Sequence, residues 1–138
     1  MAEELLRSKL EDSALEVDVA SAGTGAWDRA PVSEGAYLVS LEHGLDLSHH
    51  RAALLTRDLV GDASLILTMA RHHRSRVEEL GGSGKVYLLG EYGGLAGPEA
   101  EVSDPFGADI DAYRATFAQL DTLLDRAMPR LLEAFRDD

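Results

Sequence analysis

The stretch Ala63-Ser64-Leu65-Ile66-Leu67-Thr68-Met69 decides the fold. It is a short, mainly apolar run with three consecutive large aliphatic residues, Leu65, Ile66 and Leu67, which predicts a strand covered on both faces. Strands of that kind are typical of parallel sheets, because helices pack on both sides of them. We therefore expect helices before and after residues 63–69.

The sequence that follows this strand alternates in the expected way. Ala70–Leu80 predicts a helix closed by Gly81-Gly82, Lys85–Leu89 predicts the next strand, and Gly90–Gly97 predicts a Gly-rich loop. Pro129 is expected to end or kink the last helix. That helix is predicted from one apolar stripe at alternating spacings of three and four residues, formed by Ile110, Tyr113, Phe117, Leu120, Leu124, Ala127 and Leu131.

The sequence before residues 63–69 shows the same alternation. Ala2 to about Leu10 predicts a helix, and the alternating run Leu15–Val19 predicts a half-exposed edge strand. Ser33 is a plausible cap of a helix that Gly44 ends, and Thr56 of a short helix through Leu59. Strands alternating with helices imply an α/β three-layer sandwich with a parallel sheet, one domain over residues 1–138, and ligands at the carboxyl ends of the strands.

The composition excludes several classes of partner and chemistry. A net charge of −12, from 25 acidic and 13 basic residues, argues against nucleic acids and anionic membranes as partners. The 138 residues contain no cysteine, so they supply neither a disulfide nor a thiol nucleophile. No secretory leader or membrane span is visible, and we expect a cytoplasmic protein. The oligomeric state is not predicted.

One loop, Val102-Ser103-Asp104-Pro105-Phe106-Gly107, stands out as a candidate for chemistry. Pro105 fixes its own φ and biases Asp104 away from the helical region, which holds the carboxylate on a rigid, extended loop. A carboxylate presented in this way can act as a general acid. The alternative is an ordinary Asp-Pro turn.

Other candidate motifs favour plain structural roles. The pairs His49-His50 and His72-His73 do not have the spacing of three or four residues that a helical metal site uses, so we expect surface or scaffold roles and no metal. Gly23-Thr24-Gly25 is not followed by the third glycine of a dinucleotide-binding motif. Arg71, Arg74 and Arg76 form a basic face that we expect to be solvated.

Five features occur in order along the chain. They are Met1-Ala2-Glu3, Ser21-Ala22-Gly23-Thr24 with Trp27, Gly44-Leu45-Asp46-Leu47-Ser48 with His50-Arg51-Ala52, Ala63–Met69, and Asp104-Pro105-Phe106-Gly107 with Tyr113. Together these stretches resemble the low-molecular-weight protein tyrosine phosphatase family. The run from Lys85-Val86 through Asp104-Pro105-Phe106-Gly107 to Tyr113 also resembles the bacterial protein arginine phosphatases of the same family.

The resemblance implies a metal-free phosphatase without a cofactor that acts on phosphorylated protein. In the family, the cysteine of a Cys-x5-Arg loop attacks phosphorus, and the loop's N–H groups and arginine hold the phosphoryl oxygens. By position, Asp104 would be the general acid that protonates the leaving group and then the base that activates water. Trp27 would lie at the pocket mouth, with Thr24 and Phe106 as further pocket residues. Ser21–Thr24 with Trp27 favours phosphotyrosine over phosphoarginine.

The chain departs from the family pattern at its first residue. In the family, a strand and the Cys-x5-Arg loop precede the helix start that Met1-Ala2-Glu3 resembles, so about fifteen residues are absent. The absent strand would lie in the middle of the sheet, between residues 15–19 and 63–69. We expect the 138-residue chain to be inactive, and we favour Met1 as an internal residue of a longer product because the rest of the framework is intact. The alternatives are a shortened, non-catalytic binding module and the family's arsenate-reductase branch, which also needs cysteines.

Overall fold

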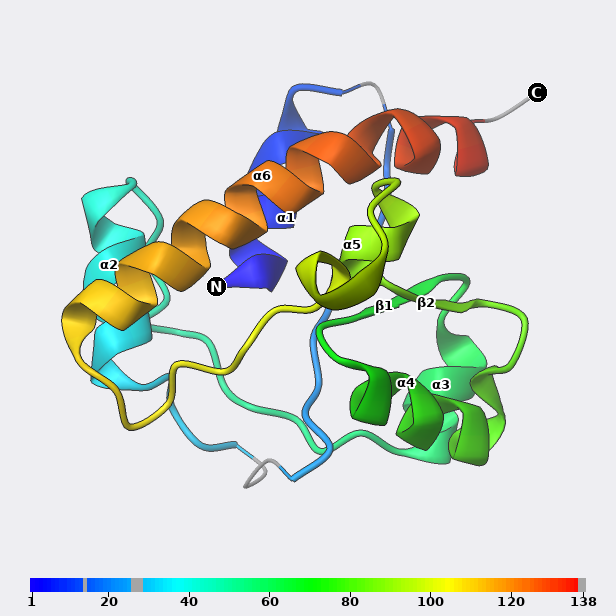
Figure 1. The fold of residues 1–138 in the computed structure, drawn as a ribbon, viewed down its shortest axis with the longest axis horizontal. Helices are drawn as coiled ribbons and strands as arrows, with labels where there is room; N and C mark the ends of the chain where they lie inside the picture. The colour runs from blue at the N-terminus through cyan, green and yellow to red at the C-terminus, as the bar shows by residue number, and fades with distance from the viewer. Residues whose placement is uncertain (14, 26–28, 137–138) are drawn as a thin grey trace.

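Two short parallel strands lie at the centre of the computed structural model, which describes residues 1–13, 15–25 and 29–136 (Figure 1). Ile66–Thr68 (β1) pairs with Val86–Leu88 (β2), and Ile66 lies opposite Val86. The helices are α1 (Ala2–Glu11), α2 (Glu34–Glu42), α3 (Arg57–Asp62), α4 (Arg71–Val77), α5 (Leu89–Tyr92) and α6 (Ile110–Ala134), with a π-helical turn η1 (Glu78–Gly82) and a 3-10 turn η2 (Gly97–Ala100).

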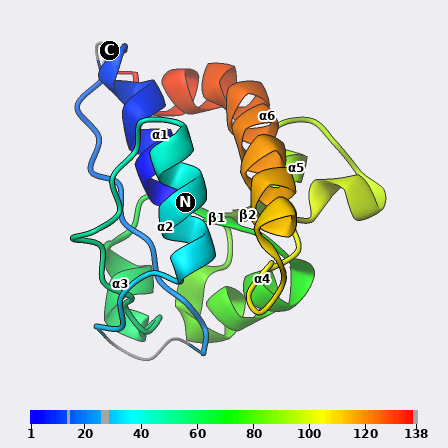
Figure 2. The ribbon, with the colours of Figure 1, turned by 90° about the vertical axis from the view of Figure 1, so that its left-hand side faces the viewer.

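Helices cover both faces of this sheet, so the predicted α/β three-layer architecture is confirmed. Figure 1 shows α1, α5 and α6 on one side of the strands and α3 and α4 on the other, and α6 contacts both α1 and α2 (Figure 2). Ile66 and Val86 pack with Val60 of α3 and Val77 of α4. Leu65, Leu67 and Tyr87, which alternate with them, pack against the larger core formed by α1, α2, α5 and α6.

The strand at residues 63–69 is shorter and less buried than expected. Only three of the seven residues are in β1, and Leu65, Ile66 and Leu67 are half-buried. Both faces of the strand are packed, as predicted, but within the described residues β1 has β2 as its one neighbour in the sheet. An edge position leaves one side of each residue uncovered, which explains the partial burial.

The prediction of a strand at Leu15–Val19 is wrong. The apolar residues 15, 17 and 19 are half-buried and the acidic residues 16 and 18 are exposed, so the alternation is present in space. However, the segment has no strand beside it in the described part of the chain. A strand exists only through ladder hydrogen bonds to a neighbour. A side-chain hydrogen bond holds the end of this segment instead, from Arg7 Nη2 to Val19 O at 2.6 Å.

Side-chain caps begin two of the helices, at Thr56 as predicted and at Asp109, for which no cap was predicted. Thr56 Oγ1 accepts a hydrogen bond from Leu59 N at 3.2 Å, and Asp109 Oδ1 accepts one from Ala112 N at 3.0 Å. Pro129 was expected to end or kink the last helix, and the first alternative is wrong, because α6 continues to Ala134. Leu131, two residues beyond the proline, is only 5% exposed, and its burial offsets the one hydrogen bond that proline cannot donate.

The Gly-rich stretch 90–97 is not simply a loop, because α5 occupies its first residues. Gly90 is buried against η2, and a Cβ on it would lie 2.3 Å from Ala100 Cα and 2.5 Å from Ala100 O. The atoms of Ala100 that a Cβ would meet are backbone atoms, so they cannot move aside by a side-chain rotation. The glycine is therefore required for α5 and η2 to pack.

Replacing Gly90 by alanine is expected to destabilise the protein by about 3 kcal/mol, because two backbone segments must separate. Urea unfolding of Gly90→Ala and wild type measures this difference. Gly61→Ala is the matched control, since a Cβ there meets nothing within 4 Å, and it should be neutral or slightly stabilising. Equal effects of the two substitutions would contradict the packing argument.

Candidate functional site

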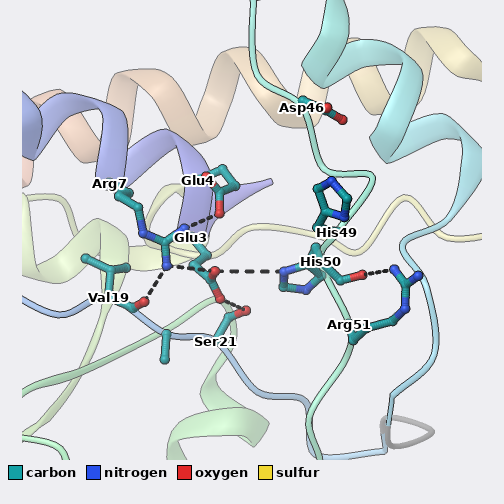
Figure 3. Close-up of a pocket in the computed structure, with 10 residues that line it drawn as sticks. Glu3, Glu4, Arg7, Val19, Ser21, Asp46, His49, His50 and Arg51 are labelled. Atoms are coloured by element: carbon teal, nitrogen blue, oxygen red, sulfur yellow. Dashed lines mark hydrogen bonds and ion pairs between the residues drawn. The ribbon is translucent and has the colours of Figure 1, made fainter.

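A cavity of about 450 Å³ opens where the first turn of α1 meets two connecting segments (Figure 3). One segment, residues 19–21, precedes the Gly-rich turn, and the other, residues 46–51, follows α2. Charged and polar side chains dominate the lining, which consists of Glu3, Glu4, Arg7, Val19, Ala20, Ser21, Asp46, His49, His50 and Arg51.

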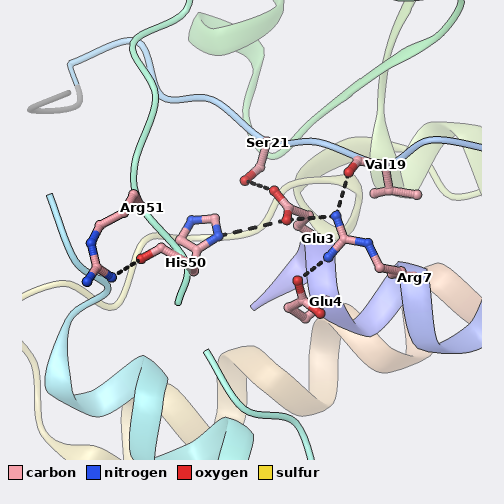
Figure 4. Close-up of polar contacts among 7 residues, drawn as sticks. All are labelled: Glu3, Glu4, Arg7, Val19, Ser21, His50 and Arg51. Atoms are coloured by element: carbon pink, nitrogen blue, oxygen red, sulfur yellow. Dashed lines mark hydrogen bonds and ion pairs between the residues drawn. The ribbon is translucent and has the colours of Figure 1, made fainter. Parts of the chain in front are cut away.

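Glu3 is the centre of the polar network that holds these three segments together (Figure 4). Its Oε1 accepts a hydrogen bond from Ser21 Oγ at 2.7 Å, and its Oε2 accepts one from Arg7 Nη2 at 2.9 Å. His50 Nδ1 lies 3.8 Å from the same Oε2. Arg7 also binds Glu4, so α1 presents two carboxylates around one guanidinium. The network joins α1 to both segments through one carboxylate.

The environment of Glu3 favours its ionised form. Burial alone would raise the pKa of the Glu3 carboxyl, but the hydrogen bonds from Ser21 and Arg7 and the charges of Arg7 and His50 outweigh it. The pKa of Glu3 therefore lies below its ordinary value of 4.5. An ionised Glu3 contributes stability that is fully present above about pH 4.5 and is lost as the pH falls through the lowered pKa of the folded state.

We expect Glu3→Gln to lower the free energy of unfolding by about 1 kcal/mol at pH 7, because glutamine keeps the shape but not the charge. The gap between variant and wild type should shrink as the pH falls below about 4.5. Urea titrations at a series of pH values measure it. Glu16→Gln, at an exposed position, should show no such pH-dependent gap. A gap for Glu3→Gln that stays constant down to acid pH would contradict the ionised network.

The segment of residues 46–51, which forms the other wall of the cavity, is held by hydrogen bonds between its side chains and its own backbone. Arg51 Nη1 donates hydrogen bonds to His50 O at 2.7 Å and Ser48 O at 3.1 Å. Asp46 Oδ1 accepts from Ser48 N at 2.9 Å, and this backbone hydrogen bond lowers the pKa of the Asp46 carboxyl. The segment is also bridged to the Gly-rich turn, since Gly23 N donates to Ala53 O and Leu55 N donates to Gly23 O, both at 2.9 Å.

The loop that carries Asp104 is anchored directly after β1. Val102 N donates to Met69 O at 2.7 Å, and Glu101 Oε1 accepts from Arg71 N at 2.7 Å at the start of α4. Gln119 Nε2 of α6 donates to Glu101 O at 2.9 Å. Three elements therefore clamp residues 101–102, and the segment that follows them emerges at the carboxyl end of β1.

Asp104 itself is exposed on this loop, and its Oδ1 accepts a hydrogen bond from Phe106 N at 3.0 Å. Phe106 is 77% exposed, and Thr24 is exposed in the turn after Gly23. These three predicted site residues do not line the cavity around Glu3. Trp27 lies outside the described residues.

His73 at the start of α4 is electrostatically coupled to this loop. Burial lowers the pKa of His73, the neighbouring His72 lowers it further, and the carboxylates of Asp104 and Glu101 act in the opposite direction. The His72 and His73 rings lie 4.0 Å apart. Among the described residues, no group of three or more His, Asp or Glu side chains could hold a metal ion.

The basic face expected at Arg71, Arg74 and Arg76 is paired with acidic side chains. Arg71 Nη1 lies 3.3 Å from Glu101 Oε2, Arg74 Nη1 lies 3.2 Å from Glu91 Oε2, and Arg76 Nη1 lies 2.9 Å from Glu79 Oε2. Its charge is therefore balanced locally.

The sequence predicts no site role for Arg7 or Glu4. Glu3, Ser21 and Arg51 occur only in stretches that resemble the family, and His50 is otherwise expected to have a surface or scaffold role. The spacing of four residues between Glu3 and Arg7 on one helix was an available local signal. The contacts to Ser21 and His50 are long-range and left no such signal.

Comparison with known proteins shows one family. A model of the low molecular weight phosphotyrosine protein phosphatase family matches residues 1–137. The probable low molecular weight protein-tyrosine-phosphatase EpsP of Ralstonia solanacearum is 34% identical over 133 residues, which cover 95% of this chain and 86% of that protein. The protein-arginine-phosphatase of Bacillus subtilis is also 34% identical over 133 residues, covering 95% and 87%.

The fold matches solved structures of the same kind. The crystal structure of the tyrosine phosphatase AmsI of Erwinia amylovora superposes with a TM-score of 0.82 and 31% identity, covering 94% of this chain and 82% of that one. No helix in the described ranges is long and apolar enough to cross a membrane.

Proposed function

This chain belongs to the low molecular weight phosphotyrosine protein phosphatase family, and from that premise we propose that it serves to hydrolyse phosphotyrosine in phosphorylated proteins through a cysteinyl-phosphate. The 138 residues contribute the general acid and the framework. They contain no cysteine, and we propose that the nucleophile and the phosphate-binding arginine come from a Cys-x5-Arg segment upstream of Met1. We propose that the 138 residues alone are inactive.

The single observation that carries this proposal is the match of the family model to residues 1–137. The position of the Asp104 loop supports it. The loop is tied to Met69, directly after β1, and the carboxyl ends of parallel strands are where α/β sheets bind their ligands. Asp104 is exposed there and is oriented by the hydrogen bond from Phe106 N.

The proposed chemistry has two steps. The cysteine sulfur forms a bond to phosphorus as the bond from phosphorus to the phenolic oxygen breaks, and Asp104 gives its proton to that oxygen. In the second step water attacks phosphorus, its proton passes to Asp104, the sulfur–phosphorus bond breaks, and phosphate leaves. The exposed ring of Phe106, two residues from Asp104, can pack on the substrate's aromatic ring.

Phosphoarginine is the second candidate substrate. It is favoured by the likeness to the protein-arginine-phosphatase of Bacillus subtilis, whose 34% identity equals that of the tyrosine phosphatase relative. A third candidate is a non-catalytic module of the same fold that binds phosphorylated proteins.

The test uses a longer chain that carries the Cys-x5-Arg segment, assayed on phosphotyrosine and phosphoarginine peptides. Phosphate release mainly from phosphotyrosine supports the proposal, and release mainly from phosphoarginine supports the second candidate. The mass of the native protein's N-terminal peptide shows whether cells make the longer chain. A native protein that starts at Met1 and binds phosphotyrosine peptides without turnover would be the non-catalytic module.

A further inference from the structure

A second cavity, of about 370 Å³, lies at the amino end of β1, opposite the end that carries the Asp104 loop. Its walls come from the segment just before β1, from β2, from α5 and from the last turns of α6. The lining consists of Ser64, Leu65, Tyr87, Tyr92, Arg130, Glu133, Ala134 and Phe135. Leu65, Tyr87 and Phe135 pack on the main core and are half-buried, so an apolar surface faces the cavity.

Arg130 is held over this surface by two aromatic rings. The centre of its guanidinium lies 4.1 Å from the Tyr92 ring centroid and 4.9 Å from the Tyr87 ring centroid. The two rings are themselves 5.2 Å apart. Tyr92, which is 5% exposed, also donates a long hydrogen bond of 3.5 Å to Arg130 O. The arginine is therefore positioned before any ligand arrives.

The guanidinium of Arg130 differs from those of the paired arginines. Arg114, for example, binds Glu42 and Asp111, both at 2.8 Å. Within the described part of the chain, Arg130 has no carboxylate within 4.0 Å and its side chain donates no hydrogen bond. Glu133, the acidic residue in the same lining, is 3.3 Å from Arg136. The donors of Arg130 are thus available at the edge of an apolar cavity.

This combination selects a particular chemical class of ligand. A guanidinium fork matches a carboxylate, to which it can donate two parallel hydrogen bonds. The aromatic and aliphatic walls offer no hydrogen-bond partners to a hydrated ion, but they can bury the apolar part of a ligand. We propose that this cavity binds a small aromatic monocarboxylate, with the carboxylate on Arg130 and the ring against Tyr87 and Phe135. The site is independent of the proposed phosphatase function.

Titration of the native protein with phenylacetate, followed by two-dimensional NMR, tests the proposal. We expect saturable shifts at Leu65, Tyr87 and Phe135 with a Kd of about 1 mM. Benzyl alcohol, which has the ring but not the charge, should bind at least about tenfold more weakly. No saturable shifts up to about 10 mM phenylacetate, or shifts centred on His49–Arg51 instead, would overturn the proposal.

Two arginine variants separate this site from general attraction of an anion. Arg130→Gln should raise the Kd for phenylacetate at least about tenfold, because glutamine has no positive charge and cannot donate two parallel hydrogen bonds to the carboxylate. Arg57→Gln, at an exposed position on α3 outside the lining of this cavity, removes the same charge and should leave the Kd unchanged. Urea unfolding checks that both arginine variants are folded. Tyr87→Leu removes one of the rings that contact Arg130 and should also weaken binding of phenylacetate. An unchanged Kd in Arg130→Gln would overturn the proposal.

Discussion

A longer chain with a strand and a Cys-x5-Arg loop directly upstream of Met1 is expected to hydrolyse a phosphotyrosine peptide about 10⁶-fold faster than the 138-residue chain. The reason is that the proposed mechanism needs a thiolate to attack phosphorus, and the 138 residues contain no cysteine. The remaining nucleophiles, such as serine hydroxyls, are weak without an adjacent base. Initial rates of phosphate release at equal protein concentration measure the ratio.

The matched control is the same longer chain with its cysteine replaced by serine. It keeps the added strand and loop, so it separates the loss of the nucleophile from any gain in folding. We expect its rate to fall to that of the 138-residue chain, while circular dichroism shows it folded. Turnover by the 138-residue chain within tenfold of the longer chain would contradict the assignment of the nucleophile to the upstream segment.

Asp104→Asn in the longer chain is expected to lower kcat on phosphotyrosine by about 10² to 10⁴, which is the usual range for a general acid. Asparagine keeps the shape of the side chain, and its carbonyl oxygen can still accept the hydrogen bond from Phe106 N. It cannot deliver a proton to the leaving oxygen. Inhibition by free phosphate should stay nearly unchanged, because the substitution leaves the phosphate-binding loop intact.

The rates of Asp104→Asn on substrates with different leaving groups provide a second test of the role of Asp104. 4-Nitrophenyl phosphate has a better leaving group that needs less protonation, so Asp104→Asn should slow it less than phosphotyrosine. Asp109→Asn is the matched control, since Asp109 is an exposed carboxylate five residues away that caps α6, and asparagine caps equally well. Equal turnover in wild type and Asp104→Asn would remove Asp104 from the mechanism.

Features of the fold that depend on local pattern were predictable from the sequence. The stripe from Tyr113 to Leu131 placed α6, and the caps at Thr56 and Ser33 placed α3 and α2. Residues 15–19 show the limit of such reasoning. Their alternation is real, but whether an alternating segment is a strand depends on a neighbour far away in the sequence. The continuation of α6 through Pro129 also depends on tertiary packing, at Leu131.

The candidate site was predictable only in part, for the same reason. The loop of Asp104 could be found from Pro105 and the helix that follows it. Its anchors could not, because Met69 and Gln119 lie far from Glu101 and Val102 in the sequence. The ties from Glu3 to Ser21 and His50 likewise join segments that have no shared periodicity. The role of Asp104 stays a prediction.

The connection between α1 and α2 has a consequence for chain entropy. Residues 12–33 form no helix or strand in their described part, and an unstructured connection of that length is uncommon in a compact domain. It is tied at intervals, by Arg7 to Val19 O, by Glu3 to Ser21, and by backbone hydrogen bonds from Gly23 and Arg29 to residues 52–53. Each tie turns one long loop into shorter ones, so ordering occurs in small steps.

Two of those ties are also walls of the cavity around Glu3. The conformational freedom of the connection and the order of the cavity are therefore thermodynamically linked. The hydrogen bonds of the loop already order Glu3 and Ser21, so a ligand that binds these residues loses less conformational entropy. A substitution that loosens the loop would increase the entropy lost when any ligand binds there.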